Sequence, residues 1–164
     1  MGTLDQPPRI LIVDDDSATL RLLTAYLVSD GYAVVTAGSE REVLGYFEST
    51  AFDLVLLDLI HSPLDRSRIC RRIKESSGGR STTVIVSADA HTLAERAVLH
   101  DAGADDFLSK PYRRTELLLR VGATLRSGSL SRKLQDKTLE LKSAKTLLRK
   151  QAVRLTAPRS RTAP

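Results

Sequence analysis

Two short apolar runs that each end in an aspartate mark the first third of the chain. Residues 10–13 lead into Asp14, and residues 54–57 lead into Asp58. Both runs are continuous and bounded by polar residues, which predicts strands buried on both faces of a parallel sheet. Parallel neighbours bring their carboxyl ends to one edge of the sheet, where α/β folds place their sites. We therefore expect Asp14, Asp15 and Asp58 to lie close together.

Strand and helix signals alternate along the rest of the first 120 or so residues. Apolar residues recur at helical spacing after residue 17, and Asp30-Gly31 predicts the end of that helix. Ser39 with Glu42 three residues later predicts a capping box. Pro63 is expected in a loop. The predicted elements are strands at 10–13, 32–35, 54–58, 83–86 and 106–108, with helices at 17–28, 39–47, 67–74, 91–100 and from about 112.

This order predicts an α/β fold with a flavodoxin-like, doubly wound, five-stranded parallel sheet. Right-handed crossovers leave few topologies, and strand order 2-1-3-4-5 is the one we expect. Ser87 then ends the fourth strand, and Lys110 ends the fifth. Both are expected at the edge that holds Asp58.

The charge of the chain is uneven. Its 164 residues carry a formal net charge of +5. Residues 1–128 hold 15 Lys and Arg against 18 Asp and Glu, whereas residues 129–164 hold 10 against 2. This predicts a mildly acidic domain followed by a basic extension.

Composition excludes some classes of protein. No stretch approaches the length and apolarity of a membrane span, and the N-terminus does not resemble a secretory signal. Cys70 is the only cysteine, which excludes an internal disulfide and fits the reducing cytoplasm. Its expected role is that of a small buried residue on a helix.

Clustered carboxylates repel one another unless a cation neutralises them. The predicted arrangement therefore indicates a hard divalent metal beside a carboxylate nucleophile. A metal-dependent phosphohydrolase is one alternative, since Asp14 and Asp16 have the two-residue spacing of its common form. The best nucleophile here, Asp58, is instead on the third strand.

Four motifs in order resemble those of the receiver domain of two-component response regulators, a family of bacterial signalling proteins. They are Ile-Val-Asp-Asp-Asp at 12–16, Leu57-Asp58, Val-Ser-Ala at 86–88 and Gly-Ala-Asp-Asp-Phe-Leu-Ser-Lys-Pro at 103–111. The resemblance covers residues 8 to about 126. It implies a phosphoacceptor rather than an enzyme, one that at most catalyses its own phosphorylation from donors and its own dephosphorylation.

The resemblance also implies roles for individual residues. Asp58 accepts a phosphoryl group from the phosphohistidine of a sensor histidine kinase or phosphotransfer protein. Asp15 and Asp58 bind Mg²⁺ directly, Asp14 binds it through water, and the backbone carbonyl of Ile60 adds a ligand. Lys110 stabilises the charge of the phosphoryl group.

The resemblance also implies a conformational switch that responds to phosphorylation. Ser87 donates a hydrogen bond to the phosphoryl group, and the small Ala88 leaves room for it. Phe107 is the aromatic residue that turns inward when Ser87 moves. Because Phe107 lacks a hydroxyl, its switching would rest on packing, and a simple core role is the alternative.

The loop after Asp58 departs from the family pattern. Pro63 stands one place later than the usual proline, and Arg66 stands where glycine is expected. Glycine at such a place often adopts positive φ, so we expect this loop to follow another path. His61 is expected either near the phosphate or facing solvent.

The basic extension carries a leucine at every seventh residue, which predicts a dimeric coiled coil over 127–155. The alternate seam positions are polar or small, so a single helix folding back on its own domain is the alternative. Residues 156–164 are expected to be disordered. The heptad leucines are Leu134, Leu141, Leu148 and Leu155.

Three outputs are open for this extension. It could transmit the signal by dimerisation or partner docking, it could bind nucleic acid or an anionic membrane surface through its cations, or it could lead into an enzymatic output domain of a longer regulator. The absence of a helix-turn-helix pattern and of aromatic residues after 128 makes the nucleic-acid reading unspecific.

Overall fold

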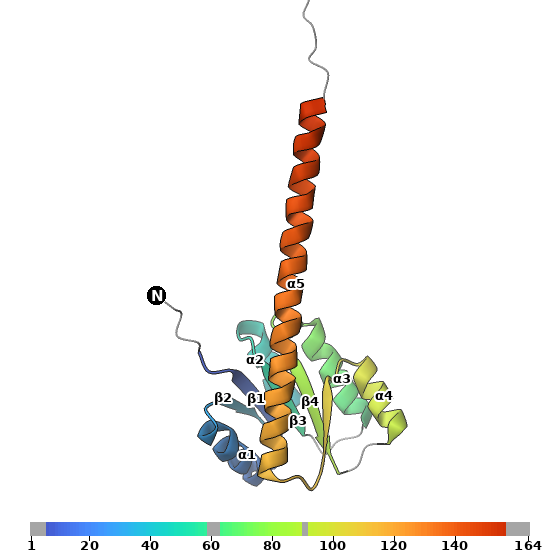
Figure 1. The fold of residues 1–164 in the computed structure, drawn as a ribbon. Coiled ribbons are helices and arrows are strands. Elements are labelled where there is room, and N and C mark those ends of the chain that lie inside the picture. Colours follow the sequence, from blue (N-terminus) through green and yellow to red (C-terminus); the bar gives the residue numbers. More distant parts are fainter. Residues whose placement is uncertain (1–5, 59–62, 90–91, 157–164) are drawn as a thin grey trace, which may run out of the picture. The chain divides into compact units, whose positions relative to one another are not determined.

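The computed structural model describes residues 6–58, 63–89 and 92–156. Its core is one five-stranded parallel sheet with the order β2-β1-β3-β4-β5 (Figure 1). The predicted topology is therefore confirmed. The strands are β1 (Arg9–Asp14), β2 (Ala33–Ala37), β3 (Leu54–Asp58), β4 (Thr83–Ala88) and β5 (Asp106–Ser109).

Five helices alternate with these strands. α1 and the first part of α5 pack on one face of the sheet, and α2, α3 and α4 pack on the other. The helices are α1 (Ser17–Ser29), α2 (Glu40–Ser49), α3 (Pro63–Glu75), α4 (Leu93–Asp101) and α5 (Arg114–Thr156).

The continuous apolar strands supply both faces of the core. In β1, Ile10 and Ile12 pack toward α1 and α5, whereas Leu11 and Val13 pack toward α2 and α3. All four side chains are fully buried. Successive side chains of a strand point to opposite faces, so a run without polar residues is what a sheet covered on both sides requires.

Helix ends differ in detail from the sequence predictions. Pro63 begins α3 rather than lying in a loop, as suits a residue without a backbone N–H. Ser39 caps α2, but Glu42 reaches back to the N–H of Gly38, so the predicted capping box is incomplete. A complete capping box occurs instead at Thr92 and precedes α4.

The chain divides into two compact units, Met1–Gly128 and Ser129–Pro164. The first contains the sheet. In the second, residues 129–156 are helical, as predicted for 127–155, and the predicted disordered tail lies outside the described residues. No helix in the described part of the chain is long and apolar enough to cross a bilayer.

Candidate functional site

Asp14 and Asp58 end neighbouring strands and are register partners in the β1–β3 ladder. Each is only 2% exposed. Asp15, one residue further along, is exposed. The strand ends thus bring together two of the three predicted carboxylates in a buried position and leave the third at the surface.

Lys110 is the cation of this site. Its Nζ lies 2.8 Å from Oδ1 of Asp58. The backbone N–H of Lys110 donates to the carbonyl of Ala88 at 2.8 Å, which fixes the end of β5 against the end of β4. The peptide bond from Lys110 to Pro111 is cis. Lys110, which we expected at the sheet edge that holds Asp58, thus forms an ion pair with that carboxylate.

Several buried polar atoms of the site have no hydrogen-bond partner among the described residues. They are Oδ2 of Asp14, Oδ2 of Asp58 and the hydroxyl of Ser87. Oδ1 of Asp14 accepts from the backbone N–H of Asp16 at 2.7 Å. A buried polar atom without a partner costs free energy, so three such atoms at one sheet edge indicate a site that a ligand completes.

Burial changes the acidity of both carboxyl groups. The pKa of Asp14 is raised from 3.8 to about 6, mainly by burial; the hydrogen bond from the backbone of Asp16 lowers it, and the charge of Asp58 raises it. Burial also raises the pKa of Asp58, although Lys110 opposes this through its hydrogen bond and its charge. Burial alone would lower the pKa of Lys110, but the hydrogen bond to Asp58 and the charge of Asp58 raise it.

Ser87 lies at the end of β4 and is fully buried. Its hydroxyl is near enough to Asp58 to lower the pKa of that carboxyl group, but its geometry does not meet that of a hydrogen bond. Ala88 beside it is also buried. The hydroxyl therefore retains its capacity to donate to an incoming group at Asp58.

A divalent cation fits this donor set in part. The two unpartnered carboxylate oxygens of Asp14 and Asp58 are hard anionic ligands of the kind that Mg²⁺ takes. Within the described part of the chain, no three acidic, histidine or cysteine side chains are grouped closely enough to enclose a metal. Mg²⁺ commonly retains several waters, so a site with two carboxylates suits it. The predicted ligand Ile60 and the neighbouring His61 lie outside the described residues.

Asp16 serves as a helix cap. Its carboxylate accepts from the backbone N–H groups of Ala18 and Thr19, at 3.1 and 3.0 Å, and from the Thr19 hydroxyl at 2.7 Å. These hydrogen bonds lower the pKa of Asp16. Asp16 is therefore the N-cap of α1.

Phe107, the predicted switch aromatic, is partly buried against the core on the α3 and α4 side. The guanidinium carbon of Arg96, on α4, lies 5.0 Å from the centre of its ring. The sequence did not predict this contact, because no motif links a residue of α4 to the aromatic residue of β5. The stacked pair connects α4 to the end of β5.

Arg66 is a second residue that sequence reasoning did not place in the site. It belongs to the first turns of α3, and its Nη1 donates to the backbone carbonyl of Ser87 at 3.5 Å. Its charge lowers the pKa of Asp58. The one signal for it was the replacement of the expected glycine.

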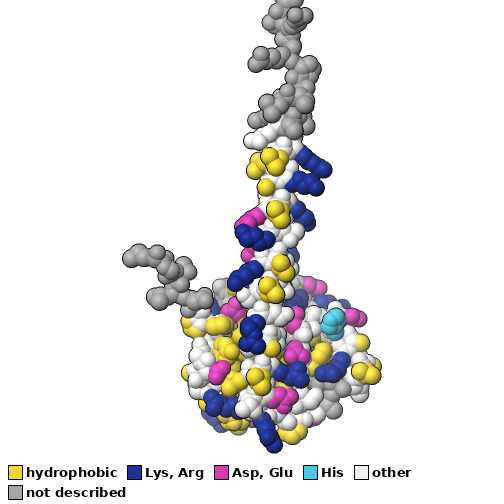
Figure 2. Space-filling model, viewed as in Figure 1, with side chains coloured by type: hydrophobic (Ala, Val, Ile, Leu, Met, Phe, Trp, Pro, Cys, Tyr) yellow, Lys and Arg dark blue, Asp and Glu magenta, His cyan; other side chains and the backbone are white. Residues whose placement is uncertain are grey.

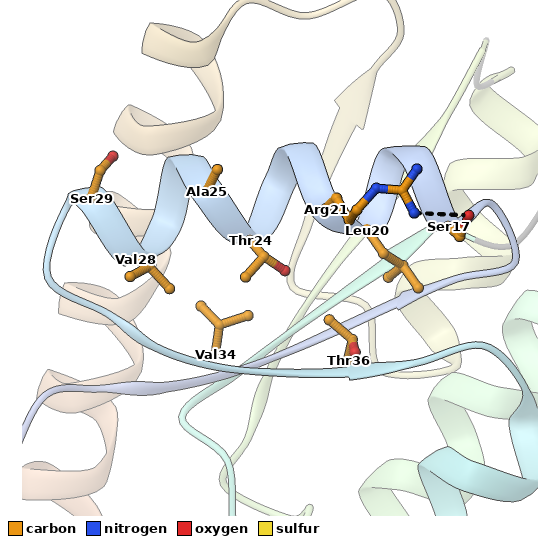
Figure 3. A pocket seen from close by; sticks show the side chains of 9 residues that line it. All are labelled: Ser17, Leu20, Arg21, Thr24, Ala25, Val28, Ser29, Val34 and Thr36. Carbon is orange, nitrogen blue, oxygen red and sulfur yellow. Dashed lines mark hydrogen bonds between the residues drawn. The ribbon is translucent and has the colours of Figure 1, made fainter.

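A groove of about 740 Å³ lies elsewhere on the domain, between α1 and the edge strand β2 (Figure 3). Its apolar floor includes Leu20, Val28 and Val34, and a hydrogen bond from Arg21 to Ser17 crosses one end. None of the carboxylates of the site lines it.

The second unit exposes most of its leucines. Figure 2 shows hydrophobic and basic side chains together on the visible face of α5 beyond Gly128. The heptad residues Leu134, Leu141 and Leu148 are 61, 70 and 66% exposed. The side chain of the fourth, Leu155, lies outside the described residues.

Comparisons with known proteins agree on the family of the first unit. The family model described as "Response regulator receiver domain" matches residues 10–122. A response regulator MprA from Mycolicibacterium vanbaalenii is 40% identical over 120 residues, 73% of this chain and 51% of that protein. The transcriptional regulatory protein ResD of Bacillus subtilis is 36% identical over 121 residues, 74% of this chain and 49% of that protein. The chain thus spans about half the length of the curated relatives it matches.

Solved structures show the same fold. A CheY-like receiver domain protein from Methanospirillum hungatei is 26% identical, with a TM-score of 0.69 over 76% of this chain and 98% of that one. The receiver domain of the sensor histidine kinase PA1611 from Pseudomonas aeruginosa, solved with magnesium in its active-site cleft, is 26% identical, with a TM-score of 0.64 over 73% and 98%. The paired aspartates, the lysine at the end of β5 and these matches lead to one conclusion: the chain belongs to the response regulator receiver domain family of two-component systems.

Proposed function

We propose that Asp58 is the phosphoacceptor and that it takes its phosphoryl group from a phosphohistidine of a sensor kinase or phosphotransfer protein. The observation that carries this proposal is the environment of its carboxylate. Oδ1 is held by Lys110 at 2.8 Å, whereas Oδ2 is buried with no partner among the described residues. A carboxylate that is both oriented and incompletely bonded is suited to nucleophilic attack.

The chemistry is an in-line phosphoryl transfer. A carboxylate oxygen of Asp58 forms the new O–P bond while the N–P bond of the phosphohistidine breaks, and the imidazole nitrogen keeps the electron pair of that bond. Such transfer depends mainly on positioning and on stabilising charge around the phosphoryl oxygens. Lys110 supplies one positive charge, and the unpartnered hydroxyl of Ser87 supplies one hydrogen-bond donor.

We propose Mg²⁺ as the cofactor, held by Asp14 and Asp58 together with water and with the predicted ligands Asp15 and Ile60. When bound, Mg²⁺ neutralises the carboxylates and draws charge from the phosphoryl oxygens. The unpartnered oxygens of Asp14 and Asp58 support this assignment, as does the similar PA1611 receiver domain, which was solved with magnesium coordinated in its active-site cleft.

The site is tested with a small-molecule phosphodonor and intact mass spectrometry. In the presence of Mg²⁺ the wild-type chain should gain the mass of one phosphoryl group, and Asp58→Asn should not. Asp53→Asn is the control, because Asp53 directly precedes β3 and is therefore at the other side of the sheet from Asp58; this variant should be labelled like the wild type. Labelling that persists in Asp58→Asn would show that the acceptor has been assigned wrongly.

We further propose that residues 129–156 transmit the signal by self-association, with the heptad leucines as the seam. Three exposed leucines at seven-residue spacing on one helix support this. The second candidate is nucleic-acid binding, favoured by the excess of cations in this segment. Salt separates them, because binding to nucleic acid weakens steeply as salt rises and association through leucines does not.

A further inference from the structure

Arg66 differs from the neighbouring arginines of α3 in what it contacts. Arg68 and Arg72 bind the carboxylate of Glu40, at 2.7 and 3.2 Å. Arg66 instead reaches the backbone carbonyl of Ser87. Its Nε is buried and has no hydrogen-bond partner among the residues that the structure describes. The guanidinium is therefore held at the sheet edge with one donor unused.

That sheet edge is the one that carries the acceptor. Ser87 follows Val86, which is the register partner of Leu57, the residue before Asp58. A guanidinium at the carbonyl of Ser87 is thus beside the end of β3. The positive charge of Arg66 lowers the pKa of Asp58 and so favours its ionised form.

Phosphorylation of Asp58 would increase the negative charge at this sheet edge. The acceptor carboxylate carries one negative charge, whereas a phosphoryl group carries close to two and presents three strong acceptor oxygens. Lys110, already bound to Asp58, brings a single point charge. A planar guanidinium can engage two phosphoryl oxygens at once.

We infer that Arg66 is a second phosphate-binding cation of this site, which turns from the carbonyl of Ser87 to the phosphoryl group on Asp58. The inference rests on the proposed acceptor role of Asp58. At 3.5 Å the hydrogen bond to Ser87 is longer than a strong one, so little is lost when it is given up. The unused Nε–H gains an acceptor in exchange.

Glycine is expected at this position from the receiver pattern, so Arg66 is a departure of this chain from that pattern. It would make the phosphorylated state bind its phosphoryl group through two cationic side chains. The hydrogen bond to the carbonyl of Ser87 is the contact that Arg66 gives up when it responds to the new charge.

The test uses beryllofluoride, a tetrahedral anion that mimics a phosphoryl group on a carboxylate, titrated into the full chain with Mg²⁺ and followed by NMR. Arg66→Gln should weaken its apparent affinity roughly tenfold or more, the cost of a charge-assisted hydrogen bond. Arg66→Lys keeps the positive charge but lacks the planar guanidinium, so its affinity for beryllofluoride should be intermediate. Arg68→Gln is the matched control, since it removes the same charge from an exposed residue paired with Glu40, and it should change affinity less than twofold.

The Nε–H resonance of Arg66 gives a readout that a purely structural role would not move. It should shift strongly when beryllofluoride binds the wild type. If affinity in Arg66→Gln stays within twofold and this resonance does not move, while Asp58→Asn abolishes binding, the role of Arg66 is overturned and that of Asp58 stands. If the wild type neither binds the mimic nor accepts phosphate, both fail. A loss of thermal stability in Arg66→Gln without a loss of affinity would assign Arg66 to anchoring α3 instead.

Discussion

Asp14 and Asp58 are register partners at the ends of β1 and β3, and each keeps one buried carboxylate oxygen without a partner among the described residues. Two buried carboxyl groups of this kind repel each other when both are ionised. The pair is therefore unfavourable in the empty domain and becomes favourable when a cation binds. Stability and metal binding should consequently be coupled through these two side chains.

The first prediction concerns pH. The pKa of Asp14 is raised from 3.8 to about 6 in the folded state. Between these two pH values Asp14 is therefore protonated in the folded protein and ionised in the unfolded chain. The contribution of Asp14 to stability is thus present below about pH 4 and is lost as pH rises through about 6. In Asp14→Asn without metal this loss should disappear, a relative gain on the order of 3 kcal/mol at neutral pH. Urea denaturation across this range measures it, and parallel profiles for the two proteins would contradict it.

Magnesium should stabilise the domain. A ligand present at about a hundred times its dissociation constant adds roughly 2.7 kcal/mol to the free energy of unfolding. Thermal denaturation with and without Mg²⁺ should show this increase in the wild type and not in Asp58→Asn. Asp16→Asn is a close control, because asparagine also caps a helix and Asp16 uses its oxygens for that cap. An equal response of wild type and Asp58→Asn would place the cation elsewhere.

Lys110 should matter for the rate of phosphorylation. Lys110→Gln removes the cation bound to Asp58, so the pKa of Asp58 should rise further and the phosphoryl oxygens should lose a charged donor. We expect phosphorylation by a small-molecule donor to slow by roughly 10²-fold, as when a charge-stabilising donor is removed from an active site. Lys110→Arg keeps the charge and should recover part of the rate. Time courses by intact mass measure this, and a rate unchanged in Lys110→Gln would remove Lys110 from the mechanism.

The stacking of Arg96 on Phe107 should favour the ring position seen here. The guanidinium lies 5.0 Å from the ring centre, and a contact of this kind contributes about 0.5–1 kcal/mol. A double-mutant cycle with Arg96→Ala and Phe107→Leu should show a coupling of that size in the free energy of unfolding. On phosphorylation the coupling should fall if Phe107 moves as the switch requires. A coupling that is the same in both states would make Phe107 a core residue only.

Self-association through the helix is tested by substituting leucines on and off the heptad seam. Leu141→Asn combined with Leu148→Asn places two amides on the heptad seam and should convert a dimer into a monomer. Leu139→Asn is the matched control, because Leu139 is also exposed but lies off the heptad. Analytical ultracentrifugation at several concentrations gives the mass. A wild-type chain that is monomeric at every concentration would exclude the coiled coil.

The strands were predictable because a sheet covered on both faces needs uninterrupted apolar runs. Ile10 to Val13 and Leu54 to Leu57 are too short for buried helices and are bounded by polar residues, which leaves strands as the better assignment. The position of Asp58 followed, since a polar residue that ends such a run must lie at the sheet edge. Helix starts were less predictable, as Pro63 shows, because a proline satisfies both a loop and the first turn of a helix.

The sequence by itself therefore determined the order of the elements, the sheet topology and the edge at which Asp14, Asp58, Ser87 and Lys110 come together. These depend on local periodicity and on the handedness of crossovers, which any parallel sheet obeys. Only the tertiary structure decided which carboxylate oxygens have partners, that Arg96 stacks on Phe107, and that Arg66 reaches Ser87. Those contacts join residues far apart in the chain through side-chain rotamers, and rotamers are set by packing rather than by the neighbours in sequence.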